Sequence, residues 1–197
     1  MYVYSSLSDS ELARALNQGM VGILPTDTVY GIVCAAKNES AVVRLYQAKH
    51  REHKPGTIIA ASVAQLVDLG IDARALEKVA AWWPSPLSVV VPSGDELYYL
   101  HQGLESLAVR IPAPQELRDL LKQTGPLLTS SANQPGEPPA TNLTEAKAYF
   151  ADSVDFYVDG GQTEQSTPST LIRLDPHNRI EILRQGAVVL PSQGAKP

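Results

Sequence analysis

A layered α/β (α+β) domain built on a central β-sheet is the fold class that this sequence predicts, and three observations support it. Short apolar runs with strand character alternate with helix-like stretches from one end of the chain to the other. The 197 residues are 44% hydrophobic, which suits one domain with one sizeable core. No internal repeat and no Gly/Ser-rich linker interrupts the pattern. We therefore expect one domain over residues 1–190, followed by a flexible tail over residues 191–197.

Helices are expected where apolar residues recur at helical spacing between a capping residue and a stop signal. Ser8 or Asp9 can cap the first helix, and Asn38 and Asn142 can cap the second and the last. Pro114 can occupy the first position of the fourth helix. In chain order, the expected helices cover residues 9–19, 38–49, 75–83, 115–121 and 142–150.

Strands are expected at short apolar runs that end at proline, glycine or polar turns. In chain order, they cover residues 20–24, 57–61, 87–91, 107–111, 155–158, 170–174 and 180–184. The run Gly125-Pro126-Leu127-Leu128 leads into a polar loop that we expect over residues 129–141. Cys34 lies in an apolar run and is the one cysteine of the chain, so it forms no intrachain disulfide. We expect it to be a small buried hydrophobe and not a nucleophile.

Composition and charge narrow the classes of function. The formal net charge is −5 and aromatic residues make up 6% of the chain. Proteins that mainly coat nucleic acid are usually basic, and those that bind single strands use aromatic platforms. A local basic groove on an acidic body remains compatible with these numbers. No apolar run approaches the roughly 20 residues that span a bilayer, and the first residues lack a secretory signal. We therefore expect a cytoplasmic protein without a membrane partner.

Several common catalytic motifs are absent from the sequence. It contains no Gly-x-x-x-x-Gly-Lys-Ser/Thr loop, no Gly-x-Gly-x-x-Gly turn and no Gly-x-Ser-x-Gly elbow. Four scattered histidines and one cysteine make a zinc site improbable on spacing.

The densest cationic run is Lys49-His50-Arg51-Glu52-His53-Lys54, which follows one expected helix and precedes an expected strand. Lysine offers a point charge to phosphate, and arginine offers a bidentate fork. A solvated basic end of a helix explains the same run equally well.

Three further segments carry polar groups beside expected strands. Pro25 to Gly31 places hydroxyls, a carboxylate and a phenol in a turn after the first strand. The run Thr129-Ser130-Ser131-Ala132-Asn133 offers hydroxyls and an amide that can bind phosphate or sugar oxygens. Arg110 stands between Val109 and Ile111 on an expected strand, so it must face outward or find an anion.

Taken in order, these segments resemble the YrdC/TsaC family, the threonylcarbamoyl-AMP synthases, over about residues 10–187. The resemblance is to the short, single-domain members. It rests on seven motifs in the family's order: Pro25 to Gly31, Lys49-His50-Arg51, Trp83-Pro84-Ser85-Pro86-Leu87-Ser88, Ala108-Val109-Arg110-Ile111-Pro112, Ser131-Ala132-Asn133, Ser169-Thr170 and Arg184-Gln185-Gly186. It implies a twisted open mixed β-sheet with flanking helices and a central concave, positively lined groove.

The same resemblance implies an activity and its substrates. L-threonine, bicarbonate and ATP would give threonylcarbamoyl-AMP and pyrophosphate, and the product would feed the threonylcarbamoyl (t6A) modification of adenosine 37 in tRNA. Other t6A-synthesis proteins are implied as partners, with tRNA or double-stranded RNA as possible ligands. Mg²⁺ would accompany ATP, since charge on the phosphates must be offset. The protein ligands of the metal are unknown.

The motifs carry the family's contacts onto individual residues. The implied contacts to L-threonine are Thr26, Arg110, Thr129 and Ser169. The implied contacts to ATP are Lys49, Arg51, Ser106, Ser131, Asn133 and Arg184. We assign Lys49 and Arg51 to the transition state, because anionic substrates need fixed cations and no covalent nucleophile is required.

Some positions depart from the family pattern, and other functions stay open. Glu52 stands where the family has proline, and the segment from Arg51 to Thr57 is one residue short. Ser85, Ser88 and Pro168 replace a glycine, a threonine and a glutamate. One alternative is a YciO-like paralogue with weak or different activity, and a second is a non-catalytic module that binds tRNA or double-stranded RNA. A third is the same chemistry on another amine acceptor.

Overall fold

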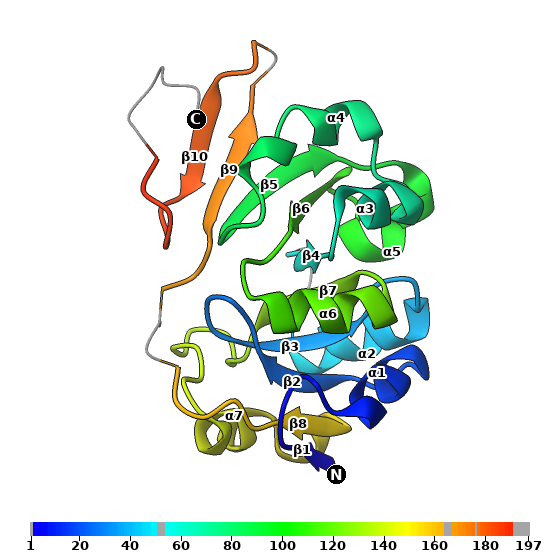
Figure 1. Cartoon of the computed structure of the whole chain (residues 1–197), viewed down its shortest axis with the longest axis vertical. Helices are drawn as coiled ribbons and strands as arrows, with labels where there is room; N and C mark the ends of the chain where they lie inside the picture. Colours follow the sequence, from blue (N-terminus) through cyan, green and yellow to red (C-terminus); the bar gives the residue numbers. More distant parts are fainter. Residues whose placement is uncertain (1, 51–53, 164–166, 176, 191–197) are drawn as a thin grey trace.

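The computed structural model describes residues 2–50, 54–163, 167–175 and 177–190. A mixed, ten-stranded sheet runs through the whole molecule in the order β1-β8-β2-β3-β7-β4-β6-β5-β9-β10 (Figure 1). The pairs β1–β8, β2–β8, β4–β6 and β5–β9 are parallel, and the other neighbours are antiparallel. The strands are β1 (Tyr2–Tyr4), β2 (Gly22–Pro25), β3 (Tyr30–Ala35), β4 (Thr57–Ile59), β5 (Leu87–Pro92), β6 (Ser106–Arg110), β7 (Leu127–Ser131), β8 (Phe156–Val158), β9 (Thr170–Leu174) and β10 (Ile180–Arg184).

Helices cover both faces of this sheet. The α-helices are α1 (Ser10–Asn17), α2 (Glu39–Ala48), α3 (Val63–Leu69), α4 (Ala73–Glu77), α5 (Tyr98–His101), α6 (Gln115–Thr124) and α7 (Leu143–Phe150). Side chains of α1 and α6 pack with Leu24, Val33, Ile59 and Leu127 in one cluster. Alternate residues of the same strands, such as Ile58, point the other way. None of the helices in the described residues has the length and apolarity that a membrane crossing requires.

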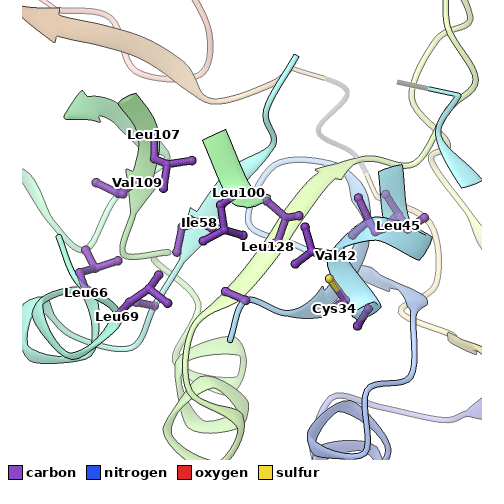
Figure 2. Close-up of a cluster of buried hydrophobic side chains, with 14 of the residues drawn as sticks. Cys34, Val42, Leu45, Ile58, Leu66, Leu69, Leu100, Leu107, Val109 and Leu128 are labelled. Carbon is purple, nitrogen blue, oxygen red and sulfur yellow. The ribbon is translucent and has the colours of Figure 1, made fainter. Parts of the chain in front are cut away.

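The larger core cluster lies on the opposite face, under α2, α3, α4, α5 and α7. Figure 2 shows part of it, where helix side chains meet the middle strands of the sheet. The labelled members are Cys34, Val42, Leu45, Ile58, Leu66, Leu69, Leu100, Leu107, Val109 and Leu128. Burial raises the pKa of the Cys34 thiol to about 12. The prediction of an inert, buried cysteine is therefore confirmed for its environment.

Most expected elements are present. The helices expected at 9–19, 38–49, 115–121 and 142–150 are α1, α2, α6 and α7, and Asp9, Asn38 and Asn142 cap the ends expected of them. All seven expected strands have a counterpart in the sheet. Pro114 precedes α6 as its cap residue and is not its first residue. The expected tail at residues 191–197 lies outside the described residues, and its flexibility stays a prediction.

Two further sequence expectations are wrong. The single helix expected over residues 75–83 is replaced by α4 and a separate 3₁₀ turn, Ala80–Trp82. The polar loop expected over residues 129–141 begins too early, because Thr129–Ser131 belong to β7. These residues pair with β3 at Val33, Ile32 and Gly31, so backbone hydrogen bonds override their polar character. The strands β1 and β3 and the helices α3 and α5 were not expected.

Candidate functional site

One face of the central strands stays partly exposed. Thr57, Ala108 and Ser131 are half-buried, whereas Ile58 and Val109, their alternates on the same strands, are fully buried. The register pairs Thr57 with both Thr129 and Ala108. Because paired residues point to the same face, Thr129 lies on this partly open face too. The sheet thus presents a row of small side chains that α1 and α6 leave partly uncovered.

The turn between β2 and β3 brings two of the predicted residues together. The Thr26 hydroxyl donates to the carbonyl of Val29 at 2.6 Å and closes the turn. A Cβ atom on Gly31 would lie 2.6 Å from Thr129 Oγ1 and 3.0 Å from Thr26 Cγ2. Both threonines therefore pack against the space that a glycine leaves at this position.

Arg110 ends β6 and finds its anion inside the protein. Its guanidinium lies 2.8 Å from a carboxylate oxygen of Asp27, and the side chains are only 4% and 2% exposed. Burial raises the pKa of Asp27, although Arg110 opposes the shift, and burial lowers the pKa of Arg110, although Asp27 opposes it. The expectation that this arginine must face outward or find an anion is confirmed. Its contact with L-threonine stays a prediction.

Hydrogen bonds continue from Arg110 to Arg184 on β10. Arg110 Nη1 donates to Ser88 Oγ at 3.2 Å, and Ser88 Oγ lies 3.0 Å from Ser169 Oγ. Arg184 Nη2 donates to the Ser169 carbonyl at 2.9 Å and to Ser169 Oγ at 3.2 Å. The structure thus joins three predicted residues, Arg110, Ser169 and Arg184, from β6, the start of β9 and β10.

Lys49 follows α2 and is 4% exposed. Its ammonium donates to the carbonyl of Ser131 at 2.8 Å, to the carbonyl of Asn133, and to Asn133 Oδ1 at 3.0 Å. The Ser131 hydroxyl donates to the same Asn133 Oδ1 at 2.6 Å. The alternative of a solvated helix end is therefore wrong for Lys49. Arg51, Glu52 and His53 lie outside the described residues.

Ser106 lies at the opposite end of β6 from Arg110. Its hydroxyl donates to the carbonyl of Leu104 at 3.1 Å. It begins β6, whereas Arg110 ends it, so the two are separated by roughly 13 Å of extended strand. His101, which is 1% exposed, accepts hydrogen bonds from the backbone of Gly103 and Glu105 and fixes the loop before Ser106.

Three residues contribute to this network of contacts although the sequence assigned no role to them. Asp27 and Ser88 link the predicted residues, and both lie inside motifs that were recognised. Tyr30 donates its hydroxyl to the Gly161 carbonyl and accepts from Gly160 N, both at 2.9 Å. It thereby fixes the backbone of Gly160 and Gly161, which follow β8. The sequence shows a carboxylate in the motif Pro25 to Gly31 and an arginine that needs an anion, but nothing local pairs Asp27 with Arg110.

A cavity of about 420 Å³ adjoins the same turn. It is lined by Ser5, Ser6, Leu7, Pro25, Thr26, Pro114, Glu116, Leu117, Val158, Asp159 and Gly160, so Thr26 is the one predicted residue in its wall. Within the described residues, no three His, Cys, Asp or Glu side chains lie close enough together to hold a metal ion.

The sequence matches the family model Sua5_yciO_yrdC, described as "Telomere recombination", over residues 14–186. It is 34% identical over 178 residues to a putative threonylcarbamoyl-AMP synthase of Mycobacterium tuberculosis, covering 88% of this chain and 82% of that protein. It is 36% identical over 169 residues to a threonylcarbamoyl-AMP synthase of Coxiella burnetii, covering 82% and 90%.

Solved structures with the same fold agree with this match. P. abyssi Sua5, solved in complex with L-threonine, superposes with a TM-score of 0.82 at 28% identity over 94% of this chain. This chain spans 58% of that longer protein. E. coli YciO superposes with a TM-score of 0.77 at 20% identity over 94% of this chain and 93% of its own, which indicates a shared fold.

Proposed function

We propose, from the premise that this chain belongs to the Sua5/YciO/YrdC family, that it is an L-threonylcarbamoyladenylate synthase, an enzyme of the nucleotidyltransferase type. Curated relatives that cover most of its length carry the name threonylcarbamoyl-AMP synthase. The observation that carries the proposal is the convergence of five distant motifs. One continuous chain of polar contacts joins Asp27, Arg110, Ser88, Ser169 and Arg184.

The proposed reaction has two steps that balance. The amine of L-threonine attacks the carbon of bicarbonate, and water leaves, giving a carbamate. A carbamate oxygen then attacks the α-phosphorus of ATP, and pyrophosphate leaves with the electron pair of the broken bond. The product, threonylcarbamoyl-AMP, would serve the t6A modification of tRNA in the cytoplasm.

The residues divide into two groups in this proposal. Thr26, Arg110, Thr129 and Ser169 contact L-threonine, with the guanidinium donating to its carboxylate. Lys49, Arg51, Ser106, Ser131, Asn133 and Arg184 contact ATP. Positioning the carbamate in line with the α-phosphorus and offsetting negative charge supply the catalysis, so Lys49 and Arg51 act on the transition state.

Mg²⁺ enters with ATP in this proposal. The described residues offer no cluster of three acidic, histidine or cysteine ligands. In this proposal the ion is held mainly by phosphate oxygens and water, as Mg²⁺ often is. When bound, the ion would offset charge on the phosphates, while the cations of the chain fix their position.

A single assay tests the function. The protein is incubated with ATP, Mg²⁺, bicarbonate and L-threonine, and pyrophosphate and the acylated adenylate are measured. We expect release of pyrophosphate that depends on threonine and on bicarbonate. Turnover with another amino acid in place of threonine would redirect the proposal to a different amine acceptor. Absence of pyrophosphate together with salt-sensitive binding of RNA would favour the RNA-binding module and overturn it.

A further inference from the structure

The ion pair between Asp27 and Arg110 is unusual in both its position and its burial. Asp27 lies in the turn between β2 and β3, whereas Arg110 lies on β6, and two strands, β7 and β4, separate β3 from β6 in the sheet. The turn therefore has to fold over the face of the sheet for the two charges to meet at 2.8 Å. The pair joins parts of the sheet that backbone pairing alone does not connect directly.

Stability alone explains this pair poorly. Both side chains are at most 4% exposed. Removing two charges from water costs about as much as their attraction returns, so an apolar pair of similar volume would serve a core equally well. An ion pair at such a site fixes geometry, because only one arrangement satisfies both charges.

The guanidinium is held at two points and keeps a donor without a partner. Arg110 Nη2 lies 2.8 Å from Asp27 Oδ1 in an ion pair, and Arg110 Nη1 donates to Ser88 Oγ. Its buried Nε has no hydrogen-bond acceptor among the described residues. A buried donor left without an acceptor costs about 1–3 kcal/mol, which an arriving acceptor would recover.

We propose that Asp27 is a positioning residue for the substrate amino acid: it holds Arg110 in one orientation for the substrate carboxylate and, through Ser88, orients the Ser169 hydroxyl. This inference rests on the proposed function, and it extends it to two residues, Asp27 and Ser88, that act through others. Asp27 follows Thr26 in the chain. The same turn therefore carries one predicted contact to threonine, Thr26, and orients two others, Arg110 and Ser169.

The test separates L-threonine from ATP. Asp27→Asn keeps the shape and one oxygen but removes the charge. We expect its KM for L-threonine to rise about tenfold or more, with the KM for ATP and kcat at saturating threonine changed less than about threefold, the pattern of lost uniform binding. Asp27→Glu restores a carboxylate and should return the KM for threonine toward wild type. A role in packing alone would leave the longer Glu no better than Asn.

Asp155→Asn is the matched control. Asp155 pairs with Arg44 at 2.8 Å in a partly exposed position and also accepts from the backbone of Val21. This substitution removes a carboxylate from another ion pair, which joins α2 to the residue before β8. It should leave both KM values unchanged.

Ser88→Ala keeps the proposal testable if Asp27→Asn does not fold. It removes the hydroxyl between Arg110 and Ser169 and should raise the KM for threonine about three- to tenfold, again with little change for ATP. An unchanged KM for threonine in a folded Asp27→Asn, or in Ser88→Ala when Asp27→Asn does not fold, overturns the proposal. Wild-type protein that releases no threonine-dependent pyrophosphate instead overturns the proposed function, so the two failures are distinct.

Discussion

The two buried cations of the site, Lys49 and Arg110, are held in different ways. Lys49 donates to three neutral oxygens that all belong to the short segment Ser131–Asn133. Arg110 pairs with a carboxylate from a turn that is distant in sequence and across the sheet. The pair of Arg110 and Asp27 is therefore close to neutral as a unit.

This difference suits two kinds of ligand. In the proposed function, Lys49 offers a point charge to the triphosphate of ATP. A neutral pair discriminates by geometry, as recognition of an amino acid with both an ammonium and a carboxylate requires. The predictions below test whether Lys49 and Arg110 differ in this way.

The largest effect on stability is expected when one partner of the ion pair between Asp27 and Arg110 is removed. Arg110→Leu leaves the Asp27 carboxylate buried without its partner and should lower the free energy of unfolding by about 3–5 kcal/mol. The double variant Asp27→Leu, Arg110→Leu removes both charges and should recover most of that loss. Urea unfolding of the two variants measures the difference. Equal destabilisation of both would show that the pair contributes through packing and not through charge.

Lys49→Met should reduce turnover more than stability. Methionine keeps an apolar stem of similar length but removes the ammonium that binds the Ser131 and Asn133 carbonyls. We expect a loss of roughly 10²-fold or more in kcat, and of about 1–3 kcal/mol in the free energy of unfolding. Pyrophosphate release and urea unfolding measure the two effects. A solvated side chain would change stability by less than about 0.5 kcal/mol.

Lys49→Arg is the control for that experiment, since it keeps the charge but changes the geometry of the donors. It should retain more turnover than Lys49→Met.

The Cys34 thiol, whose pKa burial raises to about 12, reports on the folding of the sheet in each variant. It should resist alkylation in every folded variant and react once urea unfolds the chain.

Gly31→Ala should affect threonine use selectively. The added Cβ would lie 2.6 Å from Thr129 Oγ1 and 3.0 Å from Thr26 Cγ2, so both predicted contacts must move. We expect about 1–3 kcal/mol of destabilisation and a KM for threonine that rises about tenfold. Gly22→Ala is the control, because its Cβ would crowd the ring of Phe156 on the far side of β2. It should lose stability without a shift in KM, and a shift of equal size would point to a general loss of order.

The sequence predicted the regular elements well where local signals were strong. Asp9, Asn38 and Asn142 accept the backbone hydrogen bonds expected of helix caps. It failed where pairing with distant strands decides the conformation. Thr129–Ser131 have loop-like composition, yet β3 pairs with all three residues and β4 pairs with Thr129. The strand β3 shows only a polar motif and an apolar run in the sequence, because nothing local marks it as a strand inside the sheet.

The site was predictable to a similar degree. The fold places Lys49, Thr26 and Ser169, which local motifs indicated, beside other polar groups. Their contacts with substrates stay predictions. They gave no sign that Asp27 reaches Arg110 or that Ser88 reaches Ser169, because those contacts depend on how strands are ordered in the sheet. The charge pattern alone did not show whether Lys49 lies in solvent at a helix end. Its 4% exposure shows that it is buried.

The smallest effect is expected at Ser106, which lies at the opposite end of β6 from Arg110. Its hydroxyl is partly exposed and donates to the Leu104 carbonyl. If it contacts ATP as predicted, Ser106→Ala should raise the KM for ATP about two- to fivefold, the worth of one ordinary hydrogen bond, and leave the KM for threonine unchanged. Ser8→Ala is the control, since it also removes a hydroxyl with one described acceptor, Glu116. An unchanged KM for ATP in Ser106→Ala would remove Ser106 from the ATP contacts and restrict that group to residues near Lys49 and Arg184.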